Sequence, residues 1–281
     1  MDFCEKISKK NRTYLTLLLI IVLIASIAMF FLFIFFAPIM VLTLNTIQGA
    51  WFIIFVIVLR IILTTSMAVY CLHLWLTQDK SYLDDLPNLL FLFFLFFTFG
   101  KVYDIFQNLV TLYIDRELNL LIMKVRYIIV VLSLIPMLYF SLKMVLTLRS
   151  IKNPSLTSQR RKKIVHRSLS LILIIEFIII LSGPSMEFIS ILLPIIAIIS
   201  LLVIAWVFYI AHKTKSLFAI NPIIVSYGFF LYLFTQLLRP ILYLTQEVFV
   251  YSFVSEILDA LVFLIVFWGL ISKPHYLKAS R

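Results

Sequence analysis

The sequence is poor in glycine, cysteine and charge, and each shortage excludes a class of protein. Five glycines in 281 residues leave no glycine-rich loop of the kind that cradles a phosphate. The two cysteines, Cys4 and Cys71, lie in the N-terminal tail and deep in an apolar run, so they build no disulfide framework. Charged residues make up 13% of the chain, about half of their usual share in a soluble domain. A soluble fold is therefore excluded.

Patterns typical of catalysis are also missing. The histidines stand at positions 73, 166, 212 and 275, and no pair has the spacing of zinc or haem ligands. Nothing in the apolar runs places a serine beside a histidine as nucleophile and base. We therefore expect a protein that is not an enzyme and that has no cofactor and no metal site.

Hydrophobic residues, in contrast, make up 63% of the chain and gather in long runs. A membrane-spanning helix needs about 20 apolar residues. The first run follows a basic tail, as in a signal peptide, but it exceeds the ~7–15 residues of a signal-peptide core, so we interpret it as a retained helix. The pattern predicts an all-α integral membrane protein with about eight transmembrane helices. They cover residues 14–36, 51–76, 87–106, 121–146, 168–181, 186–211, 222–244 and 253–271.

Basic residues predict the orientation of these spans. Eight spans place both termini on one side, and the segments on that side hold eighteen lysines and arginines against three on the other. Lysine and arginine are retained on the cytoplasmic side, so we expect both termini in the cytoplasm of a multi-pass cell-membrane protein. The segment 148–167 is the most basic, and the partners that we expect there are anionic lipid headgroups and not nucleic acid.

A short motif recurs at a fixed distance along the chain. Lys80 and Ser81 precede Pro87, and Lys215 and Ser216 precede Pro222, each displaced by 135 residues. This spacing indicates a four-plus-four parallel duplication, because four spans return the chain to its starting side. The expected organisation is a tail at 1–13, a first half at 14–147, a basic cytoplasmic loop at 148–167, a second half at 168–272 and a tail at 273–281.

Ionisable residues within the spans are the candidate ligand-binding residues, because a charge in the bilayer is costly and needs a partner. Arg60 and Glu176 each lie about 14 Å into their spans, so we predict that they form a buried pair. Lys101, Arg239 and Asp259 share a depth nearer the outer side. Asp104 follows Lys101 by three positions, a spacing that allows direct neutralisation. These six residues form either a ligand site or a structural network of salt bridges.

Parts of the second half resemble a known class of membrane module. The residues are Tyr209-Ile-Ala-His-Lys-Thr-Lys-Ser216, Ser255-Glu-Ile-Leu-Asp-Ala-Leu261 and Gly269-Leu-Ile-Ser-Lys-Pro274. They resemble the multi-span membrane input modules of prokaryotic, particularly archaeal, signalling proteins, such as those that precede histidine kinases. The resemblance implies a sensor, and without an output domain after Lys273 the signal has to pass through a partner protein.

Two functions follow as expectations. The first is a sensor-like or accessory membrane module that binds a small solute or lipid and acts through a cytoplasmic or membrane protein partner. The second is a small-solute or ion transporter whose charged site lies between the two helical halves. Solute flux separates the two.

Overall fold

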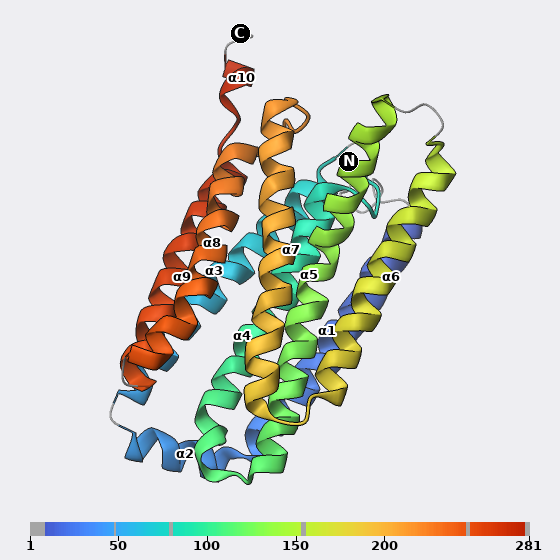
Figure 1. Cartoon of the computed structure of the whole chain (residues 1–281). Coiled ribbons are helices and arrows are strands. Elements are labelled where there is room, and N and C mark those ends of the chain that lie inside the picture. The colour runs from blue at the N-terminus through green and yellow to red at the C-terminus, as the bar shows by residue number, and fades with distance from the viewer. Residues whose placement is uncertain (1–8, 48, 79–80, 153–155, 246–247, 279–281) are drawn as a thin grey trace.

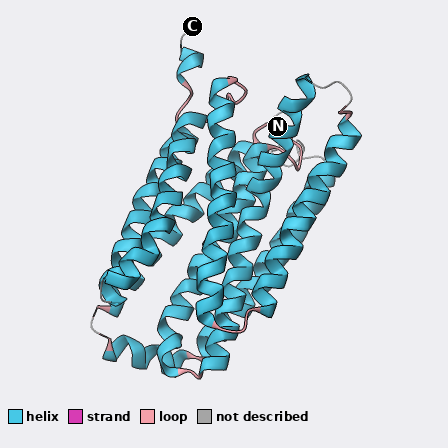
Figure 2. Ribbon diagram, viewed as in Figure 1, coloured by secondary structure: helices cyan, strands magenta, loops and turns pink. Residues whose placement is uncertain are grey.

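The computed structural model describes residues 9–47, 49–78, 81–152, 156–245 and 248–278. These residues form helices, turns and loops, and none of them is in a strand (Figure 2). The helices are α1 (Lys9–Phe35), α2 (Ala37–Thr46), α3 (Ala50–Leu76), α4 (Leu86–Val110), the 3-10 turn η1 (Thr111–Tyr113), α5 (Arg116–Lys152), α6 (Ser158–Ser182), α7 (Met186–Lys213), α8 (Pro222–Thr245), α9 (Val248–Ile271) and α10 (His275–Lys278).

The long helices lie side by side in a bundle (Figure 1). Successive long helices run in opposite directions, so α1 begins at the end of the bundle where α9 ends. Among the described residues, seven helices are long and apolar enough to cross a membrane, and α7 contributes the shorter apolar stretch Ile198–Lys213. These lengths agree with a multi-pass membrane protein, because only helices or closed barrels satisfy the backbone in lipid.

Two segments expected as loops are helical. Residues 37–46 form α2, which lies across one end of the bundle (Figure 1), and its Thr43 hydroxyl donates a 2.6 Å hydrogen bond to the Leu109 carbonyl. The basic segment 148–167 belongs mostly to α5 and α6, which extend beyond the predicted spans. Lysine and arginine favour helix, and Thr157 caps α6 by accepting a hydrogen bond from the Arg160 amide.

Aromatic side chains join the two halves of the chain in the core. The Phe93 ring on α4 meets the Phe229 ring on α8 edge to face at 5.8 Å between centroids. Phe229 in turn stacks on Phe208 of α7 at 5.9 Å. Phe94 of α4 packs against Phe263 of α9 at 6.4 Å. Helices α4, α7, α8 and α9 are therefore held together by one buried aromatic cluster.

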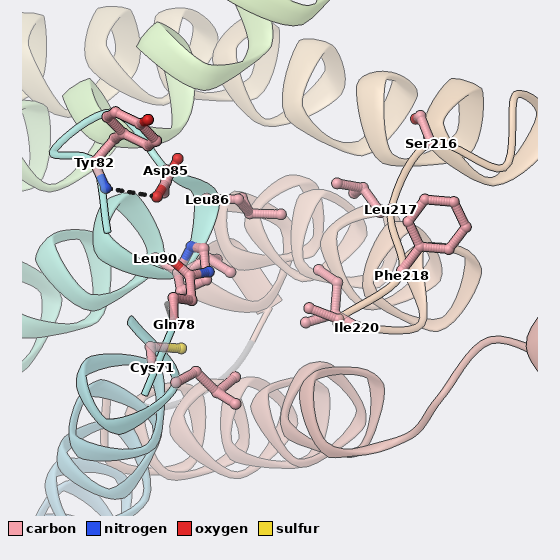
Figure 3. Close-up of a pocket in the computed structure, with 13 residues that line it drawn as sticks. Cys71, Gln78, Tyr82, Asp85, Leu86, Leu90, Ser216, Leu217, Phe218 and Ile220 are labelled. Carbon is pink, nitrogen blue, oxygen red and sulfur yellow. Dashed lines mark hydrogen bonds between the residues drawn. The ribbon is translucent and has the colours of Figure 1, made fainter. Parts of the chain in front are cut away.

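A pocket of about 440 Å³ opens near the end of the bundle where α1 begins (Figure 3). It lies between the α3–α4 connection and the α7–α8 connection, which are the two segments that carry the recurring motif. Its lining residues are Cys71, Leu74, Gln78, Tyr82, Asp85, Leu86, Pro87, Leu90, Ser216, Leu217, Phe218, Ala219 and Ile220.

Candidate functional site

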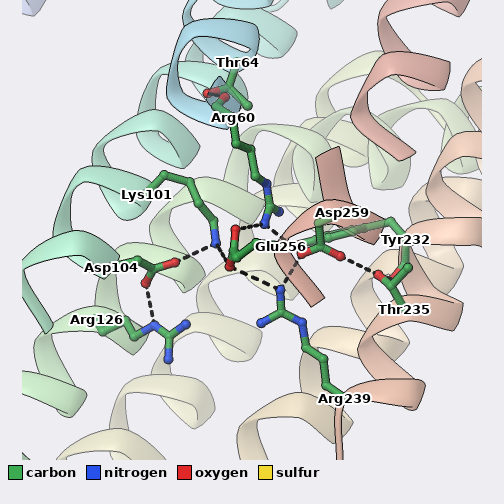
Figure 4. A network of polar contacts seen from close by, with 10 residues as sticks. All are labelled: Arg60, Thr64, Lys101, Asp104, Arg126, Tyr232, Thr235, Arg239, Glu256 and Asp259. Carbon is green, nitrogen blue, oxygen red and sulfur yellow. Dashed lines mark hydrogen bonds and ion pairs between the residues drawn. The ribbon is translucent and has the colours of Figure 1, made fainter. Parts of the chain in front are cut away.

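Seven charged side chains from five helices meet inside the bundle (Figure 4). We name this group the charge cluster. It consists of Arg60 from α3, Lys101 and Asp104 from α4, Arg126 from α5, Arg239 from α8, and Glu256 and Asp259 from α9. Helices α3, α4 and α5 belong to the first half of the chain and α8 and α9 to the second, so the charge cluster joins the halves.

Arg60 is the most deeply buried cation of the charge cluster, with no exposed side-chain surface. Its Nη1 donates a hydrogen bond to Glu256 Oε2 at 2.7 Å and lies 2.9 Å from Asp259 Oδ2. The guanidinium carbon lies 5.2 Å from the Phe97 ring centre and 5.1 Å from that of Phe263. Two carboxylates and two aromatic rings therefore compensate the charge that α3 carries into the core.

Helices α4 and α5 supply a second part of the charge cluster. Lys101 Nζ donates to Asp104 Oδ2 at 2.6 Å and to Glu256 Oε1 at 3.2 Å. Arg126 Nε donates to Asp104 Oδ1 at 2.7 Å. The three-residue spacing on α4 puts Lys101 and Asp104 on one helix face, as the sequence predicts.

Helices α8 and α9 supply the third part. Arg239 Nη2 forms an ion pair with Asp259 and lies 3.7 Å from Glu256 Oε1. The Thr235 hydroxyl donates to Asp259 Oδ1 at 2.6 Å. Asp259 therefore accepts from Thr235 and Arg239 on α8 while it faces Arg60 on α3.

Among its seven named members, the charge cluster contains more cations than carboxylates. Four cations face three carboxylates. Within the described part of the chain, Nε and Nη2 of Arg60 are buried and have no hydrogen-bond partner. Arg126 and Arg239 are the partly exposed members, with 28% and 18% of the side chain accessible. The two Arg60 donors are suited to a small anion, because a buried polar group is costly until a partner accepts its hydrogen bond.

The structure brings five of the six candidate residues together and corrects one pairing. Arg60 pairs with Glu256 and Asp259, so the predicted Arg60–Glu176 pair is wrong. Glu176 is buried on α6, which packs against α5 and α7, whereas α3 packs against α4 and α9. Equal depth in the membrane fixes only one coordinate of a residue, and the two helices are not neighbours.

Two members of the charge cluster are absent from the six candidates. Glu256 lies one helical turn before Asp259, at the depth of the other outer charges, so its position in the sequence was a usable signal. The sequence assigns Arg126 to the outer side of the membrane, within the orientation count. In the structure α5 begins at Arg116, so Arg126 lies about 15 Å from the start of that helix. The early start of α5 explains why Arg126 reaches Asp104.

Among the described residues, no group of three or more histidine, cysteine, aspartate or glutamate side chains could hold a metal ion. No protein-family model, curated protein or solved structure matches this chain. The charge cluster, which joins the two halves of the chain, is therefore the candidate functional site.

Proposed function

We propose that this chain is a multi-pass membrane module that binds a small anionic solute at the charge cluster and acts in a sensor-like or accessory role. The observation that carries the proposal is the pair of buried Arg60 nitrogens, Nε and Nη2, which lack a hydrogen-bond partner within the described part of the chain. A bound anion accepts hydrogen bonds from those two donors and adds negative charge beside the four cations of the charge cluster.

The anion approaches from the side of Arg126 and Arg239. These two side chains keep exposed surface, whereas the side chains of Arg60, Lys101 and the three carboxylates are less than a tenth exposed. An incoming anion meets the two exposed guanidinium groups first. Guanidinium is weakly hydrated and presents several donors in a plane, which favours carboxylate-like or oxyanion ligands.

The bound anion acts by shifting an equilibrium between two packings of the halves. An anion that binds one packing better than the other favours that packing by its difference in affinity. Helix α5 links the site to the basic segment 148–167, because it carries Arg126 near one end and runs to Lys152. The distance between these residues is about 39 Å along the helix axis. A protein partner or anionic lipid at the basic segment receives the change.

Thermal unfolding of the detergent-purified protein tests the proposal. Chloride, nitrate, acetate and sulfate are compared with gluconate at fixed ionic strength and with one cation. At least one small anion should raise the melting temperature in a saturable way, since a ligand of the folded state stabilises it by mass action. Arg239→Gln should lose the rise, and Arg149→Gln, an exposed arginine at the far end of α5, should keep it. Cooperative melting without any anion effect, or an equal effect in Arg239→Gln, contradicts the proposal.

A transporter is the second candidate, and the pocket favours it. The charge cluster closes the bundle toward one end with ion pairs between the halves, while the pocket opens between the same halves near the other end. One open side and one closed side are what alternating access requires. Flux of the stabilising anion into sealed proteoliposomes decides: flux above that of protein-free vesicles supports a transporter, and stabilisation without flux supports a sensor.

The proposed topology has eight spans with both termini in the cytoplasm. Two observations support this topology. The eight long helices in the described part of the chain run in alternating directions. The end of α5 and the start of α6, which carry the basic segment, lie at the same end of the bundle as the start of α1 (Figure 1). A parallel duplication is part of the proposal. Helices α3 and α7 begin at residues 50 and 186, and α4 and α8 begin at 86 and 222. Both displacements are close to the 135 residues of the sequence motif.

A further inference from the structure

The pocket between the α3–α4 and α7–α8 connections contains two side chains that can accept hydrogen bonds, Asp85 and Gln78 (Figure 3). Asp85 carries the one formal charge among the described lining residues, and its Oδ2 accepts a 2.8 Å hydrogen bond from the Tyr82 amide. Among the described residues Asp85 has no cationic partner. Gln78 Oε1 is buried and has no hydrogen-bond partner within the same described ranges. Two acceptor groups in one pocket favour a ligand that donates hydrogen bonds and carries positive charge.

The remaining lining is apolar and includes two exposed aromatic rings. Leu74, Leu86 and Leu90 contribute aliphatic surface. Tyr82 and Phe218 are 60% and 61% exposed, although both line the pocket. Rings of this kind attract ammonium groups through their π faces. The size, about 440 Å³, lies within the range of small-molecule sites.

We propose that this pocket binds a small amphiphilic amine. The ammonium group is placed at Asp85 and Gln78, and the apolar body lies against the leucines. The site is separate from the charge cluster and independent of its proposed anion, because the two have opposite charge preferences. On α3 the pocket residue Cys71 lies eleven positions from Arg60, about 16 Å along the helix.

An amine in this pocket also joins the two halves of the chain. Tyr82 and Asp85 belong to the first connection, and Ser216 and Leu217 to the second. A ligand that contacts both connections favours the packing in which they are close together, by its difference in affinity for the two packings. The pocket is therefore a point at which a second ligand controls the halves from the end opposite the charge cluster.

The experiment compares three compounds with one apolar body: 2-phenylethylamine, 2-phenylethanol and 3-phenylpropanoate. Each is titrated against the purified full chain carrying Cys4→Ser, in which Cys71 is the remaining thiol. The amine should raise the melting temperature by mass action and should slow modification of Cys71 by methyl methanethiosulfonate. The alcohol and the acid should need at least tenfold higher concentrations for the same effects, because neither supplies an ammonium group to Asp85.

Matched variants assign the effect to Asp85. Asp85→Asn keeps an oxygen that accepts from the Tyr82 amide and removes the negative charge. The variant should therefore bind the amine about tenfold or more weakly. Asp84→Asn removes the neighbouring carboxylate, which does not line this pocket, and should leave the affinity for the amine unchanged. Ala219→Phe leaves Asp85 in place but narrows the pocket, so it should also lower the affinity for the amine.

Three outcomes overturn the proposal. Equal effects of amine, alcohol and acid mean that the pocket is only an apolar space. An equal response in Asp85→Asn and Asp84→Asn means that the carboxylate does not hold the amine. No stabilisation and no protection of Cys71 at saturating amine, in a protein that melts cooperatively, means that the pocket takes no such ligand. If Asp85→Asn fails to fold, the response of Ala219→Phe decides, because an unaltered response there also overturns the proposal.

Discussion

Arg60 is placed where a single side chain holds together two helices that are distant in sequence. It belongs to α3, whereas both of its carboxylate partners belong to α9. Its stem and head are fully buried, so water cannot replace the lost contacts if the residue is removed. The two carboxylates stabilise the buried guanidinium, because an isolated buried charge is far costlier than a paired one.

Replacing Arg60 by methionine should therefore destabilise the fold. The variant leaves Glu256 and Asp259 without their shared cation, and breaking a buried pair typically costs about 3–5 kcal/mol. Reversible unfolding in detergent, or the melting temperature, measures the loss. Adding Glu256→Gln should recover part of it, because the second change removes one uncompensated charge. A single variant as stable as the parent contradicts the central place of Arg60 in the charge cluster.

The ion pair of Asp84 with Lys143 gives a prediction about pH. Lys143 Nζ donates to Asp84 Oδ2 at 2.5 Å, and this hydrogen bond holds the pKa of Asp84 below its ordinary value of 3.8. A lowered folded-state pKa stabilises the protein fully above the unfolded pKa of about 4 and loses that contribution as pH falls through the folded value. Both side chains are about 40% exposed, so the contribution stays below about 1 kcal/mol.

The measurement is the difference in melting temperature between the parent and Asp84→Asn across pH. The difference should be constant above about pH 5 and should shrink as pH falls below about 4. Lys143→Gln should show the same pattern, because it removes the partner of the same carboxylate. A difference that grows on acidification would show that this pair does not produce the effect.

At the scale of elements, helices α8 and α9 pack at a distance that only glycine allows. A Cβ on Gly269 would lie 2.9 Å from the Val225 backbone nitrogen, and the Gly269 carbonyl accepts a 2.8 Å hydrogen bond from the Asn221 amide. Backbone atoms cannot rotate away as a flexible side chain does. The start of α8 is therefore held against the end of α9.

Gly269→Ala should lower stability although alanine favours helix. Relieving the contact with the Val225 backbone costs about 1–3 kcal/mol, more than the ~1 kcal/mol that alanine adds within a helix. Gly100→Ala on α4 is the matched control, because its Cβ would meet only a side-chain carbon of Ile129 at 3.4 Å. The measurement is the melting temperature of each variant relative to the parent, which should fall more for Gly269→Ala than for Gly100→Ala. Equal melting temperatures would mean that α8 and α9 separate without cost.

At the scale of the whole molecule, the two ends of the bundle differ in charge. The end at which α1 begins also holds the basic ends of α5 and α6, and the opposite end holds α2 and the α6–α7 turn (Figure 1). Basic residues stay on the cytoplasmic side, so the first end is expected to face the cytoplasm. The charge cluster would then lie nearer the outer side.

Cysteine accessibility tests this orientation. Ser182→Cys, at the end of α6, and Thr214→Cys, just after α7, place exposed thiols on either side of α7, in a background with Cys4→Ser and Cys71→Ala. A membrane-impermeant maleimide on intact cells should label the thiol at 182 and should label the thiol at 214 only after permeabilisation. The opposite result reverses the topology, and labelling of both in intact cells contradicts an odd number of crossings between them.

The sequence by itself determined the helical class, the extent of most helices and the depth of the charges, because hydrophobic length and the 1.5 Å rise act along one axis. It also determined the Lys101–Asp104 pair, which lies within one helix turn. The tertiary structure alone decided that Arg60 meets Glu256 and Asp259 and not Glu176, and that Arg126 joins the charge cluster. The physical reason is that helix neighbours and facing sides depend on packing around the axis. Lipid-facing and core-facing helices are similarly apolar in this chain, so hydrophobicity carries little information about which side of a helix faces which partner.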